Sequence, residues 1–136
     1  MAIMAERLMC LSSNGKSKDC TVIDAVLEKV LATIPLGGKP EFATTDNQGK
    51  VFVNNEDTSD MIVIDSNCVV HETAGKFGTE TVTTQRGSRT MALDSKTHKI
   101  YLPAAEFAPA SVPKAEVPEP RPTMVKGSVS VFVVGK

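Results

Sequence analysis

The chain has 136 residues, of which 41% are apolar and 4% aromatic, with no Trp and with Tyr101 as its single tyrosine. This length and composition predict one small folded domain over residues 1–136 and argue against wholesale disorder. Its 15 Lys and Arg residues nearly balance its 16 Asp and Glu residues, so the formal net charge is −1. Binding to nucleic acid or to an anionic membrane needs concentrated positive charge, so we expect neither partner.

The cysteines and the amino-terminal residues indicate the compartment. Cys10, Cys20 and Cys68 are odd in number and form no CxxC pair, so we expect reduced thiols rather than a disulfide framework. The first nine residues contain no apolar run long enough for a secretion signal, and no later window is long enough for a membrane span. These features predict a cytoplasmic protein.

The first patterned segment, residues 19–34, is ambiguous. Its apolar residues recur at helical spacing, which predicts an amphipathic helix capped by Asp19. The alternative is two strands joined by a turn near residues 25–28, where the sequence supplies no Gly, Asn or Pro. Just before this segment, Asn14-Gly15 predicts a hairpin turn.

Two later segments, residues 33–54 and 82–103, are alike at an offset of 49 residues. The alignment matches Gly38 with Gly87, Phe42 with Met91, Ala43 with Ala92, and residues 50–53 with 99–102. A second echo, at an offset of 41, aligns Val22-Ile23-Asp24 with Val63-Ile64-Asp65. Repeats of roughly 40 to 50 residues are typical of propellers and other arrays. We therefore expect Phe42 and Met91 to occupy equivalent places in neighbouring sheets.

The repeated segments have the composition of short strands. Runs rich in β-branched and aromatic residues lie at 51–53, 61–65, 100–102 and 128–134, between polar turns. They favour an all-β fold of short four-stranded antiparallel blade-like sheets, with an α+β fold containing a helix near 19–34 as the alternative. The proline-rich residues 103–122 predict an extended surface loop outside the sheets.

Two runs resemble a known family, the YVTN-type seven-bladed β-propellers. Residues 22–40, which include Lys29-Val30-Leu31-Ala32-Thr33-Ile34-Pro35-Leu36-Gly37-Gly38-Lys39-Pro40, resemble one of its blades. Residues 84–103 resemble the last blade more closely, as does the ending, a proline-rich insertion followed by Val131-Phe132-Val133-Val134-Gly135. The similarity covers about residues 8–136.

Members of that family are several hundred residues long and are often exported, whereas this chain resembles an incomplete propeller of two to three blades, joined near residues 66–76. The resemblance implies that one chain cannot close a ring alone. Since an open stack exposes strand edges and apolar faces, we expect a homo-oligomer, either a dimer or a larger ring.

The best candidates for ligand contact are Arg86 and Arg89, which flank Gly87 in the predicted connection between blades. Guanidinium groups pair bidentately with carboxylates, so these two residues could hold an anion or a peptide carboxylate. The competing interpretation is that they are solvated or pair with Glu80 or Asp94.

The remaining chemically versatile residues favour structural roles. The two histidines, His71 and His98, lack the spacing of a metal site and are expected at the surface. Cys68 and His71, three residues apart, would lie on opposite faces of a strand and could not form a nucleophile pair. Asp24, Asp65 and Asp94 each end an apolar strand and are expected to accept backbone N–H bonds in the following turn.

No catalytic residue, metal site or cofactor site is predicted, and Gly37-Gly38 lacks the context of a phosphate-binding loop. We therefore expect a non-enzymatic binding or assembly module for a protein or small-molecule ligand. The alternatives are an enzyme whose site forms where chains meet, and a truncated gene product without retained activity.

Overall fold

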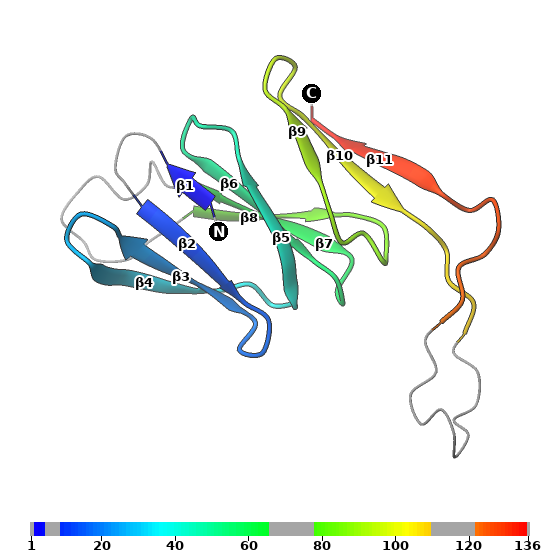
Figure 1. Ribbon diagram of the computed structural model, residues 1–136, viewed down its shortest axis with the longest axis horizontal. Helices are drawn as coiled ribbons and strands as arrows, with labels where there is room; N and C mark the ends of the chain where they lie inside the picture. The colour runs from blue at the N-terminus through cyan, green and yellow to red at the C-terminus, as the bar shows by residue number, and fades with distance from the viewer. Residues whose placement is uncertain (1, 5–8, 66–77, 110–121, 136) are drawn as a thin grey trace.

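The computed structural model describes residues 2–4, 9–65, 78–109 and 122–135 (Figure 1). These residues contain strands and turns and no helix, and their strands form three antiparallel sheets, which confirms the all-β prediction. The three sheets lie side by side in chain order, from the blue N-terminal sheet through the green middle sheet to the yellow and red C-terminal sheet (Figure 1).

Each sheet is a meander in which consecutive strands pair. The N-terminal sheet contains β1 (Ala2–Met4), β2 (Met9–Asn14), β3 (Asp19–Asp24) and β4 (Lys29–Pro35). The middle sheet contains β5 (Pro40–Thr45), β6 (Lys50–Asn55), β7 (Asp60–Asp65) and β8 (Gly78–Thr83). The C-terminal sheet has three described strands, β9 (Ala92–Asp94), β10 (Lys99–Ala104) and β11 (Ser130–Val134).

The helix considered for residues 19–34 is wrong, because this segment forms β3, a turn and β4. The carboxylate of Asp24 accepts hydrogen bonds from the backbone N–H groups of Val26 and Leu27, each at 2.9 Å, so the turn forms without glycine. The apolar residues of this segment do not share one face, since Val22 is fully buried while Val26 is 72% exposed. The helical spacing of these residues arises by chance from two consecutive strands.

The hairpins β2–β3 and β6–β7 repeat each other in register at an offset of 41 residues. Asn14 pairs with Asp19 in the first hairpin, and Asn55 pairs with Asp60 in the second. In both, the asparagine Nδ2 donates to the aspartate Oδ1, at 2.7 and 2.8 Å respectively. The Asn14-Gly15 hairpin is thereby confirmed, and the shorter of the two sequence echoes corresponds to a structural repeat.

The match of Phe42 with Met91 is wrong by one residue. β6 and β10 do correspond at an offset of 49, but the turn before β6 has three residues, 47–49, and the turn before β10 has four, 95–98. The strand before the turn is therefore displaced by one residue relative to the ungapped alignment, so that Ala43, not Phe42, corresponds to Met91. Burial agrees, because Phe42 is 40% exposed and Met91 only 6%.

Two apolar clusters hold the three sheets together. The first joins the N-terminal and middle sheets and contains Leu11, Val22 and Ile34 from one and Val53 and Ile64 from the other. The second joins the other face of the middle sheet to the C-terminal sheet through Met61, Val63, Met91, Ile100 and Leu102. The core is therefore two layers between three stacked sheets, built almost entirely from aliphatic side chains.

The proline-rich loop begins later than predicted. Pro103 and Ala104 belong to β10, which corrects the expected boundary of 103–122. Proline is tolerated at residue 103 because β9 pairs with β10 only as far as Tyr101, which leaves one edge of β10 unpaired there. Phe107 and Met124 form an isolated bridge across the base of the loop, and residues 110–121 lie outside the described part of the chain.

Candidate functional site

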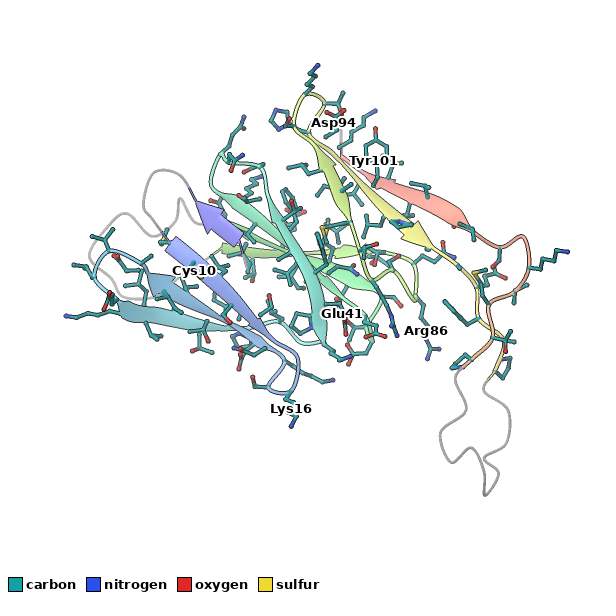
Figure 2. The ribbon with its side chains drawn as sticks, in the orientation of Figure 1. Cys10, Lys16, Glu41, Arg86, Asp94 and Tyr101 are labelled. Atoms are coloured by element: carbon teal, nitrogen blue, oxygen red, sulfur yellow. The ribbon has the colours of Figure 1, made fainter. Side chains whose placement is uncertain are left out.

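The two arginines chosen from the sequence, Arg86 and Arg89, lie in the segment between β8 and β9. The guanidinium of Arg89 forms an ion pair with Glu56, which is neither of the predicted partners. Glu56 also accepts a bond from Lys39 Nζ at 3.0 Å, so it joins cations from two inter-sheet linkers. Arg86 projects from its loop away from the sheets (Figure 2). Glu56 gives Arg89 a partner within the chain, and the ligand contact at Arg86 and Arg89 stays a prediction.

A shallow depression of about 210 Å³ adjoins this linker. Arg89 lines it, whereas Arg86 does not, and the other lining residues are Gly87, Thr90, Pro103, Ala104, Ala105, Phe107 and Val129. The lining is mostly apolar, and the one guanidinium that reaches it is already paired with Glu56. The depression thus offers an apolar contact surface rather than an anion site.

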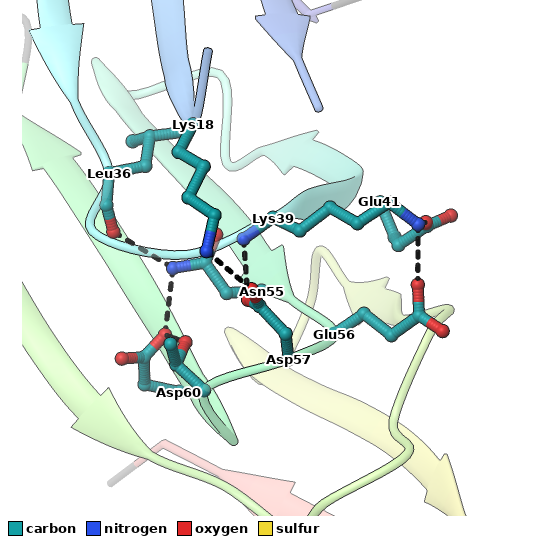
Figure 3. A network of polar contacts seen from close by, with 9 residues as sticks. Lys18, Leu36, Lys39, Glu41, Asn55, Glu56, Asp57 and Asp60 are labelled. Carbon is teal, nitrogen blue, oxygen red and sulfur yellow. Dashed lines mark hydrogen bonds and ion pairs between the residues drawn. The ribbon is translucent and has the colours of Figure 1, made fainter. Parts of the chain in front are cut away.

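The junction between the N-terminal and middle sheets carries a polar network (Figure 3). Lys18 Nζ lies 2.8 Å from Asp57 Oδ2, and the backbone N–H of Lys39 donates to Asp57 Oδ1 at 2.6 Å. These two hydrogen bonds, first the one from Lys18, hold the pKa of the Asp57 carboxyl below its ordinary value. The network joins the β2–β3 turn to the β6–β7 turn, so its role is to stabilise the junction between the two sheets.

Two adjacent asparagines at the end of β6 each hold one of the linkers between sheets. Asn55 Nδ2 donates to the carbonyl of Leu36, in the linker before the middle sheet, at 2.9 Å. Asn54 Nδ2 donates to the carbonyl of Ser88, in the linker after it. Both side chains are buried, and sequence reasoning missed them because nothing in an Asn-Asn pair indicates what it will bind.

The remaining predicted residues are placed as follows. Asp24 and Asp94 accept backbone N–H bonds in the turns that follow them, as expected, the second from Lys96 at 2.9 Å. The turn after Asp65, together with Cys68 and His71, lies outside the described residues. His98 is exposed in the β9–β10 turn, which confirms its surface position.

The two described cysteines are free thiols in different environments. Cys20 is fully buried, and desolvation raises the pKa of its thiol to about 11, with a smaller effect from Asp19. Cys10 is half-buried on the face of the N-terminal sheet that points away from the middle sheet.

The most unusual surface of the described chain is the open face of the C-terminal sheet, which sequence reasoning did not single out. We use this term for Ala92, Tyr101, Pro103, Val131 and Val133, which alternate with the residues that face the middle sheet. Val131 is 59% exposed and Val133 47% exposed. The alternation of valines at 129, 131 and 133, with no charge among residues 128–134, was its only signal in the sequence.

No protein-family model matches the chain, and a search of curated proteins also finds no match. Within the described ranges, no helix is long and apolar enough to cross a membrane. The same residues contain no group of three His, Cys, Asp or Glu side chains placed to hold a metal ion. The exposed valines of the open face make it the surface considered below.

Proposed function

We propose that this chain is a non-enzymatic assembly module, built from propeller-type blades, that associates with a second copy through the open end of its C-terminal sheet. The propeller-type part of the proposal is supported by the meander order of all three sheets and by the shared register of β2–β3 and β6–β7. The association is supported by one observation, the apolar exposure of β11.

The edge strands of this protein differ in how they are protected. β4 carries Lys29 and Pro35 and a register shift against β3, and β8 carries Glu80 among threonines. β11 reads Ser-Val-Phe-Val-Val and pairs with β10 in regular register. Charges, proline and bulges are the devices that keep edge strands from pairing with other chains. Since β11 has none of them, its composition suits a strand that is covered in the working assembly.

β11 also occupies the place of an internal strand. It pairs with β10 as β3 pairs with β2 and as β7 pairs with β6. In the first two sheets a fourth strand covers that position, namely β4 and β8. The described part of the C-terminal sheet has no fourth strand, and Phe132 is 38% exposed although it lies on the side of β11 that faces the middle sheet.

Light scattering after size exclusion tests the proposal directly. We expect the wild-type chain to have about twice the 14.5 kDa mass of one copy at micromolar concentration. Val133→Glu should weaken association about tenfold or more, because it buries a charge in an apolar contact. Val133 points away from the middle sheet, so the variant should keep its fold.

The matched control is Val26→Glu. Val26 is the more exposed valine, at 72%, but it lies in the β3–β4 turn, away from the open face. This variant should associate as the wild type does. A wild-type chain that stays monomeric at every attainable concentration, or equal weakening by both variants, would contradict the proposal.

A further inference from the structure

The internal repeat gives every sheet two distinct faces. We call the forward face the one turned towards the next sheet along the chain, and the rear face the one turned towards the preceding sheet. The cross-strand pair Leu11–Val22 lies on the forward face of the N-terminal sheet, and Phe52–Val63, 41 residues later, lies on the forward face of the middle sheet. Both junctions inside the molecule therefore pack a forward face against a rear face.

The open face of the C-terminal sheet is a forward face without a described partner. Its pair Tyr101–Val133 occupies the position of Phe52–Val63, because β10 follows β6 at an offset of 49. Tyr101 thus takes the place of a phenylalanine that is packed between sheets. The surface has the residues of a junction, but no sheet of the described residues packs on it.

The N-terminal sheet presents the complementary surface, a rear face that neither apolar cluster of the described residues includes. The residues of this rear face lie 41 positions before the residues through which the middle sheet packs on the N-terminal sheet. They are Cys10, Ser12, Thr21 and Ile23. Val30, 63% exposed, pairs with Ile23 on the same side. These five residues are small or apolar, and none of them carries a charge.

We infer that the forward face of the C-terminal sheet packs on the rear face of the N-terminal sheet of a second copy, and that two such junctions close a ring of two copies. This inference rests on the proposed function and specifies its geometry. Repeating the forward-to-rear contact between molecules is a heterologous association, which closes when its rotation allows. Cys10 and Tyr101 lie at opposite ends of the stack, as such a ring requires (Figure 2).

Cysteine cross-linking tests which surfaces meet, because a native thiol already lies on the rear face. All variants carry Cys68→Ser, and Cys20 remains because it is fully buried. Val133→Cys places a second accessible thiol on the forward face of the C-terminal sheet. A short bismaleimide is added to dilute full-length protein, so that only thiols within one assembly are joined, and the products are separated by denaturing electrophoresis.

The expected product of the Val133→Cys variant is a covalent dimer that forms from Cys10 of one copy and residue 133 of the other. Adding Cys10→Ser should reduce this product at least about tenfold, a difference that gel densitometry resolves. Val26→Cys is the control for a thiol that is accessible but lies in a turn, and it should give little cross-linked dimer.

The outcomes separate this inference from the proposed function. If light scattering finds a monomer, the proposed function itself fails. If it finds a dimer whose cross-link persists after Cys10→Ser, two forward faces meet each other, and the head-to-tail inference is overturned while the proposed function stands. A ladder of larger products would overturn the closed ring, and a dimer without any cross-link from residue 133 would overturn the contact.

Discussion

At the scale of single residues, the four-residue hairpin turns of the described chain adopt a left-handed backbone at a residue other than glycine. Lys18, Glu28, Ser59 and His98 each have positive φ, between 53° and 59°, at the last position of a four-residue turn. Such backbone costs about 1 kcal/mol or more for a residue with a Cβ, so other contacts must offset it. The aspartates that precede two of these turns provide such contacts.

Asp24→Ala tests this dependence in the segment whose sequence pattern was misleading. The substitution removes the acceptor for two N–H groups at 2.9 Å, and we expect a loss of about 1–2 kcal/mol in the free energy of unfolding. Asp24→Asn keeps a side-chain oxygen and should lose less than about half of that. Urea denaturation of the two variants compares them, and equal stability of wild type and Asp24→Ala would show that the turn forms without this carboxylate.

At the scale of elements, the linker between the first two sheets passes very close to the β6–β7 turn. A Cβ added at Gly38 would overlap Thr58 Oγ1 and lie 2.9 Å from Asn55 Cβ. The matched Gly87 lies in the next linker, where φ is 86° and an added Cβ would lie 3.2 Å from the Phe107 ring. Each linker therefore approaches a neighbouring segment closely at a glycine, although the one-residue displacement before the turn means that Gly38 and Gly87 are not structurally equivalent.

Gly38→Ala should destabilise the protein by about 2 kcal/mol, because Thr58 in the turn and Asn55 at the end of β6 must shift to admit the methyl group. Gly15→Ala is the matched control, since the nearest atom to its added Cβ lies 3.7 Å away and its φ is not positive. Thermal unfolding of both variants measures the difference. If the two lose the same stability, the close approach at Gly38 does not matter.

The same elements show which features the sequence could predict. Strand content and the repeat were accessible because β-branched residues and turn residues alternate locally, as in residues 50–53 and 99–102. The Phe42–Met91 alignment failed because a turn that is one residue shorter moves one strand against the other, and an ungapped comparison cannot detect such a change. The buried Asn54 and Asn55 were missed because their partners are backbone carbonyls from distant linkers.

At the scale of the whole molecule, the proposed ring makes stability depend on concentration. Association favours the folded state by mass action, so the thermal midpoint should rise with protein concentration. We expect a rise of a few degrees per hundredfold increase for the wild type and a smaller rise for Val133→Glu. Differential scanning fluorimetry over that range measures it, and a midpoint that does not change for the wild type would argue for a monomer.

The long connection between β10 and β11 has a consequence for the order of folding. β2–β3 and β6–β7 close over four residues, whereas β10–β11 closes over residues 105–129. The longer closure costs about 1.5 kcal/mol more in chain entropy, reduced in part by the Phe107–Met124 bridge. The C-terminal sheet should therefore fold after the other two sheets. In a newly made chain, the exposed valine strand β11 would form only once the rest of the molecule has folded. This order of folding would keep nascent chains from associating through β11 before their folding is complete.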